Sequence, residues 1–344
     1  MVISSAVMGR RLPWTDDYEQ PQPGFTMSFH EAVKVVSSTV VERVLTPRWA
    51  DNLTHGTKTM STAFKELEGY LRQTMKTHHS LPKAQSDLQE DISSPLVPES
   101  IFSSLVDASD RDAAEKGKGL ADNDVIGNVF LLLFAGHETT ASALAFALGL
   151  LALYPNVQQE VYEQINQVMG LQSRLDYSDI DKLSLVSGAF LESLRMHPVT
   201  SLNVRIAEKD TTLTVTQNGS KCESVAVPAN SYMLISHAAI HYNPTYWPEP
   251  EEFRPARFTG AYNRDAFVPF SSGGKVCIGQ KFAETEATAA LSAILARYTV
   301  SIDTALFPDI PGENFQARQE RLLRSKHFLS VTPQKVPLVF NRRT

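Results

Sequence analysis

The chain has 344 residues, of which 42% are hydrophobic and 20% are charged, so it can bury a sizeable core and is not globally disordered. The 32 basic and 38 acidic residues give a net charge of −6, which argues against a general nucleic-acid-binding protein. Two cysteines exclude a disulfide scaffold but leave room for a reactive or metal-binding thiol. The N-terminal residues contain no long apolar run, so we expect neither a signal peptide nor an N-terminal membrane anchor.

The first third of the chain predicts helices separated by loops. Residues 1–26 contain several prolines and are expected to be irregular. In 28–45 and in about 59–75, apolar residues recur at three- and four-residue steps, which is typical of amphipathic helices. Residues 77–99 are polar and predict an exposed loop. A short amphipathic piece at 101–106 is followed by a charge-rich tract that is most simply a solvated connector.

The strongest single pattern runs from about 122 to 154 and is nearly all apolar or small. As a helix it would span roughly 50 Å. A transmembrane helix is an alternative, but the stretch carries His137 and Glu138, is rich in alanine, threonine and serine, and lacks flanking lysine or arginine. A long helix buried through a large soluble domain is therefore expected.

The rest of the chain predicts more helix and a little sheet. Residues 157–197 continue in helical fashion, and 211–227 alternate around an Asn-Gly pair that indicates a β-hairpin. Residues 242–276 are expected to form loops, 277–298 a helix, and the C-terminus short strands. The predicted fold class is mainly α with a small β portion.

The most specific segment is the loop 270–279, in which Cys277 follows glycines and precedes a helix. The helix N-terminus and Lys275 both favour a thiolate, which could ligate a metal. The alternative is a buried structural cysteine beside a turn. His237 and His241, four residues apart, could in principle also pair on a helix to bind a metal.

Two further patterns combine acidic residues with possible partners. Glu138 lies beside Thr139 within the long apolar helix, where a buried acid is costly unless it is used or paired. A zinc-protease motif around His137 fails, because position 141 is alanine. Glu192 and Arg195 share a helix face at i and i+3, which by itself is a common surface pair.

Together these motifs resemble the cytochrome P450 family. The pattern Phe270-x-x-Gly273-x-Lys275-x-Cys277-x-Gly279 is similar to the haem-binding loop of that family. The resemblance implies haem b as the cofactor, with Cys277 as the proximal thiolate ligand of its iron. It also implies that Lys275 meets a haem propionate.

The same resemblance assigns the remaining motifs. The segment around Gly136, Glu138 and Thr139 is similar to the distal helix, where the glycine makes room for dioxygen and the acid–alcohol pair handles protons. Glu192 and Arg195 match the ExxR motif, whose later partner falls at Arg257; the acidic residue that usually precedes that arginine is alanine here.

The stretch after the ExxR helix implies a substrate pocket. Its candidate residues are Val199, Thr200, Leu202 and Val204, and Arg205 is a second candidate propionate ligand.

The resemblance implies one P450 domain over 1–344, similar to the C-terminal two-thirds of fungal microsomal P450s, with the N-terminal part and its anchor lacking. It implies insertion of one oxygen atom from dioxygen into a small lipophilic substrate, with electrons from NADPH through a cytochrome P450 reductase at the cytosolic face of the endoplasmic reticulum. Without an anchor this chain could be soluble. The alternatives are an impaired fragment, or a P450-fold isomerase or dehydratase that needs no external electrons; the Glu138–Thr139 pair disfavours the latter.

Overall fold

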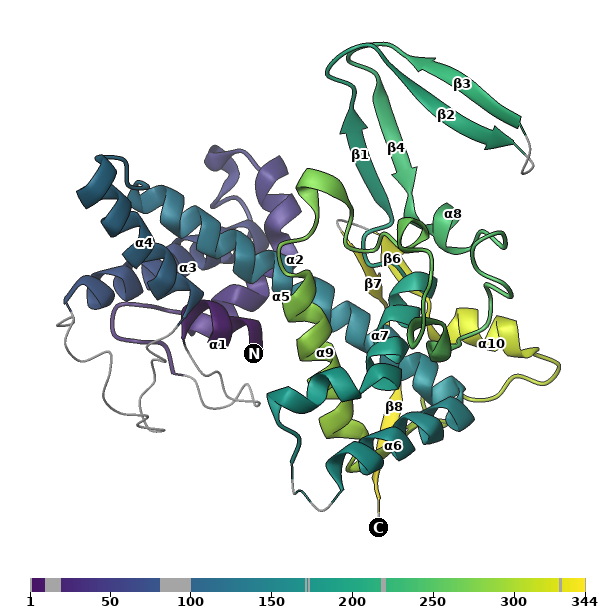
Figure 1. The fold of residues 1–344 in the computed structure, drawn as a ribbon. Helices are drawn as coiled ribbons and strands as arrows, with labels where there is room; N and C mark the ends of the chain where they lie inside the picture. Colours follow the sequence, from purple (N-terminus) through teal and green to yellow (C-terminus); the bar gives the residue numbers. More distant parts are fainter. Residues whose placement is uncertain are drawn as a thin grey trace. The chain divides into compact units, whose positions relative to one another are not determined.

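The structure is a computed structural model that describes residues 2–9, 20–80, 100–170, 172, 174–217, 221–327 and 330–343. By contacts the chain divides into two compact units, Met1–Glu138 and Thr139–Thr344, and the boundary falls inside one helix (Figure 1). One domain over the whole chain stays a prediction.

The described part of the first unit is helical. Its elements are α1 (Val2–Met8), α2 (Phe29–Leu45), the 3-10 helix η1 (Arg48–Ala50), α3 (His55–Ser80), α4 (Ile101–Lys116) and the first part of α5 (Asp122–Leu153). Ser28 caps α2, because its Oγ accepts a hydrogen bond from the Glu31 N–H at 3.1 Å. Phe29, Val33 and Leu67 belong to the core in which α2 packs against α3.

Three predictions for this unit are wrong, at least in part. The region 1–26 is not irregular throughout, because α1 occupies its start and buries Val7 and Met8. The charge-rich tract after 106 is helical as far as Lys116, which pairs with Asp112 one turn earlier at 2.8 Å. The helix ends at Gly117, whose φ of 63° is the left-handed conformation that favours glycine. The loop predicted at 77–99 is wrong for residues 77–80, which form the last turn of α3, and residues 81–99 lie outside the described residues.

The second unit carries most of the remaining helices. They are α6 (Pro155–Met169), η3 (Tyr177–Lys182), α7 (Ser184–Met196), α8 (His237–His241), η4 (Pro255–Phe258), η5 (Arg264–Ala266), η6 (Gly273–Lys275), α9 (Gln280–Leu295) and α10 (Phe315–Leu322). The second half of α5 joins α6, α7 and α9 in one core, to which Phe146, Leu150, Phe190 and Leu291 contribute. Helix α10 was not predicted.

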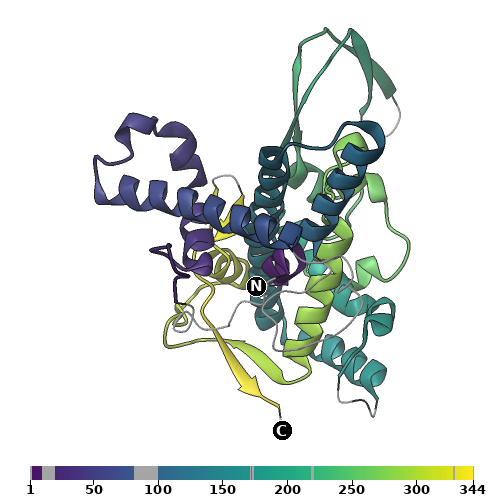
Figure 2. The ribbon, with the colours of Figure 1, turned by 90° about the vertical axis from the view of Figure 1, so that its left-hand side faces the viewer.

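The described strands of this unit form four antiparallel pairs. β1 (Leu202–Ile206) pairs with β4 (Tyr232–Ser236), β2 (Thr211–Gln217) with β3 (Lys221–Val227), β5 (Tyr298–Ile302) with β8 (Leu338–Arg342), and β6 (Ser325–His327) with β7 (Val331–Pro333). The β2–β3 hairpin is the predicted one, and it extends from the far end of the β1–β4 pair in both views (Figures 1 and 2).

Helix α5 confirms the predicted long helix but is less buried than predicted. Among the described residues it is the one helix that is long and apolar enough to cross a membrane, by length and composition. Only 28% of its most apolar 18-residue window is buried, and Leu131 is exposed. Each half nevertheless contributes to a core, Val129 to that of the first unit and Phe146 to that of the second.

Candidate functional site

Cys277 lies in a closed turn directly ahead of α9. The Cys277 N–H donates to the carbonyl oxygen of Phe270 at 2.8 Å, which closes the loop that contains η6. The first helical hydrogen bond of α9 runs from Ala283 N to Gly279 O at 2.8 Å. The helix therefore begins three residues after Cys277, and the cysteine belongs to the turn rather than to the helix.

Two residues of this loop adopt a left-handed backbone. Ser271 has φ 66° and Gly273 has φ 71°, and the latter conformation favours glycine. Gly279 has an ordinary φ of −87°, and a Cβ added there would lie 3.9 Å from Cys277 Sγ, which is a normal van der Waals contact. Backbone conformation thus favours glycine at 273, although Ser271 shows that another residue can adopt it, and space does not require glycine at 279.

The thiol of Cys277 is accessible. Cys277 is a free, exposed cysteine, so the alternative of a buried structural cysteine is wrong. Its neighbours Val276 and Ile278 are also exposed, Ile278 to 91%. Lys275 is exposed in the same turn. A free thiol therefore lies at the surface of this unit beside two exposed apolar side chains and one cation.

Arg205 reaches this loop from β1. Its Nη2 donates to Ser271 Oγ at 2.8 Å, and its Nη1 donates to the carbonyl oxygen of Val204 at 3.1 Å. The structure thus brings together Arg205 and the cysteine loop, which are far apart in sequence. Phe270 is half-buried and packs against the core of the second unit.

The four predicted pocket residues do not share one environment. Val199 is buried in the core, whereas Leu202 and Val204 are about half exposed on one face of β1. The exposed side chains opposite them on β4 include Leu234, which pairs with Val204. This apolar strand face is accessible in the described part of the chain.

The predicted distal residues lie in the middle of α5. A Cβ added to Gly136 would lie 2.8 Å from two side-chain carbons of Ile3 in α1, so Gly136 allows α1 to approach α5 closely. Glu138 and Thr139 are half-buried rather than buried, so the full cost of burying a charge does not apply to Glu138. The role of this trio in handling dioxygen stays a prediction.

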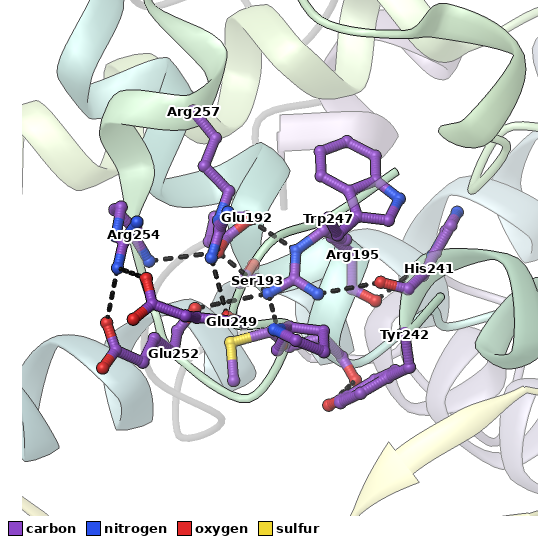
Figure 3. A network of polar contacts seen from close by, with 12 residues as sticks. Glu192, Ser193, Arg195, His241, Tyr242, Trp247, Glu249, Glu252, Arg254 and Arg257 are labelled. Atoms are coloured by element: carbon purple, nitrogen blue, oxygen red, sulfur yellow. Dashed lines mark hydrogen bonds and ion pairs between the residues drawn. The ribbon is translucent and has the colours of Figure 1, made fainter. Parts of the chain in front are cut away.

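Glu192, Arg195 and Arg257 meet in one buried network (Figure 3). Arg195 binds Glu192 with two parallel hydrogen bonds, Nε to Oε2 at 2.7 Å and Nη2 to Oε1 at 2.9 Å, and neither side chain is exposed. Arg257 Nε donates to the same Oε1 at 3.2 Å, and so does the Arg254 N–H at 3.0 Å. Burial lowers the pKa of Arg257, and the nearby Glu192 opposes that shift.

The remaining donors of Arg195 bind main-chain carbonyls. Nη1 donates to His241 O at 2.9 Å, and Nη2 donates to Pro250 O at 2.8 Å and Glu252 O at 3.3 Å. The guanidinium also contacts the ring of Trp247 at 5.6 Å (Figure 3). Arg195 therefore ties α7 to the segment that runs from α8 to η4.

The sequence interpretation missed the role of His241. It was considered only as a possible metal ligand with His237, but both of its ring nitrogens bind protein groups, Arg195 O at 3.2 Å and Val268 N at 3.0 Å. In the part of the chain that the structure describes, no three His, Cys, Asp or Glu side chains are arranged to hold a metal ion. No sequence signal indicated the contacts of His241, because its partners at positions 195 and 268 lie far from it in the sequence.

The comparisons with known proteins decide the family. The family model for cytochrome P450 matches residues 1–322. The chain belongs to the cytochrome P450 family. Cytochrome P450 monooxygenase 124 of Postia placenta is 37% identical over 99% of this chain and 64% of its own length, and cytochrome P450 3A31 of Mesocricetus auratus is 32% identical over 58% of this chain and 39% of its own length.

A solved structure supports the predicted fold. The crystal structure of a cytochrome P450 (CYP102L1) matches this chain with a TM-score of 0.74 at 22% sequence identity, covering 100% of this chain and 69% of that one. The mainly helical P450 fold is thus confirmed. The chain spans 56–64% of the fungal P450 relatives that match most of it, including cytochrome P450 monooxygenase ORF6 of Penicillium roqueforti.

The P450 family implies haem b, and the residues present fit that group. In P450s the haem iron is held by a Cys thiolate, and Cys277 is an exposed free thiol. An apolar porphyrin would cover exposed apolar surface, which Val276 and Ile278 provide. Its propionates need cations. Lys275 belongs to this loop, and Arg205 contacts it through Ser271.

Proposed function

We propose that the protein is a haem-thiolate monooxygenase that inserts one oxygen atom from dioxygen into a small lipophilic substrate. The single observation that carries this proposal is the exposed, free thiol of Cys277 in the turn before α9. The names of the relatives support it, because several are called cytochrome P450 monooxygenases.

The bound haem would supply the iron at which dioxygen is activated. Cys277 Sγ would bind that iron, and Lys275 and Arg205 would neutralise the propionates. Phe270 and Gly279, the first and last residues of the cysteine loop, would lie next to the haem. Arg205 is already oriented by its hydrogen bond to Ser271, so less conformational freedom would be lost on binding.

In the proposed reaction, Gly136, Glu138 and Thr139 of α5 would handle dioxygen and its protons. The carboxyl group of Glu138 and the hydroxyl group of Thr139 can each hold and pass a proton. Their half-buried position supports this role, because a proton donor must be in contact with a water-accessible supply.

Electrons would come from NADPH through a cytochrome P450 reductase at the cytosolic face of the endoplasmic reticulum. Lys275 and Lys281 are both exposed near Cys277, on a chain whose net charge is −6. Such a local basic surface would attract an acidic redox protein, and the attraction would weaken with salt. Fractionation of cells that express the protein tests the location.

The test of the function compares the protein with its Cys277→Ala variant after expression with a haem supply. Thiolate ligation gives a distinctive absorption band in the ferrous–CO complex, which should be present in the parent and absent from the variant. Cys222→Ala is the matched control, since it removes the other cysteine. A thiolate band that survives Cys277→Ala would contradict the assignment.

Two alternatives give different results in the same experiment. An impaired fragment would bind haem weakly and show little substrate oxidation with NADPH and reductase. A P450-fold isomerase or dehydratase would show the thiolate band but would turn over its substrate without NADPH.

A further inference from the structure

His241 is fully buried at the end of α8, and each of its ring nitrogens has a defined partner. Nε2 lies 3.0 Å from Val268 N, and Nδ1 lies 3.2 Å from Arg195 O. A backbone N–H can only donate, so Nε2 accepts. The proton of a neutral imidazole must then be on Nδ1, where it donates to the Arg195 carbonyl.

The hydrogen bond from Val268 N requires an unprotonated Nε2, and therefore a neutral imidazole. Burial lowers the pKa of His241 to about 3, and the nearby His237 adds to this shift, whereas the hydrogen bond to the Arg195 carbonyl opposes it. A single tautomer therefore fits both contacts.

On one side, His241 is fixed to the Glu192–Arg195 network. Arg195 Nη1 donates to His241 O at 2.9 Å while His241 Nδ1 donates to Arg195 O. Two hydrogen bonds in opposite directions thus join these residues, and Arg195 is held by the fully buried Glu192.

On the other side, His241 binds the stretch that closes the cysteine turn. The Val268 N–H donates to His241, and the Val268 carbonyl oxygen accepts a hydrogen bond from the Ser271 N–H at 3.0 Å. Two residues after Val268, Phe270 O accepts from Cys277 N at 2.8 Å. The ring of His241 also stacks on Phe267 at 5.5 Å.

We infer that His241 is a positioning residue for Cys277, which it connects through Val268 and Phe270 to the buried Glu192–Arg195 pair. The inference rests on the proposed function, because the orientation of Cys277 matters only if its sulfur is a ligand. His241 does not touch the ligand and acts through the main chain of the loop.

Two substitutions separate the contacts of His241. In His241→Gln the side-chain amide can place an acceptor near the position of Nε2 and keep the Val268 contact. In His241→Asn the shorter amide reaches the position of Nδ1 and loses Val268. His237→Asn is the matched control, since His237 is a buried histidine of the same helix that contacts Asn203 rather than the loop.

The first measurement is hydrogen exchange of the Val268 and Cys277 amides in the full chain, with and without haem. In His241→Asn both should exchange about tenfold faster, which corresponds to the loss of one hydrogen bond. In His241→Gln and His237→Asn both rates should stay near those of the parent. Equal exchange in the Asn and Gln variants of His241 would overturn the inference.

The second measurement is the ferrous–CO spectrum of the haem-loaded protein. The thiolate band should be kept in His241→Gln and partly lost in His241→Asn. An intact band in His241→Asn would also overturn the inference. A parent protein without any thiolate band, but with the predicted exchange pattern, would contradict the proposed function and still support the anchoring of the loop by His241.

Discussion

Gly188 of α7 lies directly against the carbonyl oxygen of Pro255 in η4. A Cβ added at position 188 would be 2.5 Å from that oxygen, far inside van der Waals contact. The absence of a side chain at 188 therefore allows η4 to pack on α7, and this packing brings Arg257 within reach of Glu192.

We expect Gly188→Ala to destabilise the protein. The clashing atom belongs to the main chain and cannot move without shifting η4, so the free energy of unfolding should fall by about 1–3 kcal/mol. Thermal or denaturant unfolding measures this loss. Gly127→Ala in α5 is the control, because nothing lies within 4 Å of its added Cβ and it should be neutral or stabilise by up to about 1 kcal/mol. Equal effects of the two substitutions would contradict the close approach.

Glu192→Gln should be strongly destabilising. It leaves the buried guanidinium of Arg195 without its carboxylate and weakens the contact of Arg257, so the expected loss is about 3–5 kcal/mol in denaturant unfolding. Glu249→Gln is the matched control, since the Glu249 side chain is exposed and pairs with Arg254 at the surface. Its effect should be below about 1 kcal/mol. A small effect of Glu192→Gln would show that the network contributes little to stability.

The protein should lose stability as the pH falls from about 6.5 to 4. Burial lowers the pKa of His197 to about 4, and Arg195 adds to the shift. In this range the unfolded chain binds a proton that folded His197 does not, so stability rises with pH. The contribution is about 3 kcal/mol across the window.

His197→Phe tests this pH dependence. His197 stacks on Phe146 at 4.6 Å, and its buried Nε2 has no hydrogen-bond partner among the described residues, so an aromatic ring can replace it. When the free energy of unfolding is measured at several pH values between 4 and 7, it should change less with pH in the variant than in the parent. A smaller change in the same direction should remain, because His241 also has a lowered pKa. An unchanged slope would rule out His197 as the source.

Thr139→Ala should uncouple electron consumption from product formation. Loss of the hydroxyl group removes one proton-transferring group of the proposed site, so the ratio of product to NADPH consumed should fall several-fold while peroxide release rises. Thr140→Ala is the matched control, because the next residue of a helix points about 100° away. Identical coupling in both variants would contradict the role of Thr139.

Local sequence patterns predicted the elements that have strong periodicity. The apolar spacing of α2 and α5, and the alternation around the β2–β3 hairpin, were sufficient because each signal lies within one segment. Helix α4 was missed beyond 106 because that part of its surface is charged, while its buried apolar residues Phe102 and Val106 and its Ser100–Ser103 capping box all lie at its start. Charge along a helix does not distinguish a solvated helix from a loop.

The candidate site was predictable only where its residues form a motif. Cys277, Glu192 and Arg195 belong to compact patterns, whereas the bond from His241 to Val268 and that from Arg205 to Ser271 join distant segments. Such contacts depend on how α8 and β1 pack against the loop, and no residue spacing in a single sequence indicates that packing.

The three carbonyl groups that hold Arg195 have an evolutionary consequence. A carbonyl is supplied by every amino acid, so Arg195 places no demand on the side chains at positions 250 and 252. Position 195 itself has little freedom, because lysine lacks the planar fork that reaches Glu192 and the carbonyls together. Saturation mutagenesis should therefore find a sharply uneven tolerance, with arginine nearly invariant at position 195 and many side chains accepted at positions 250 and 252, where only the carbonyl contacts Arg195.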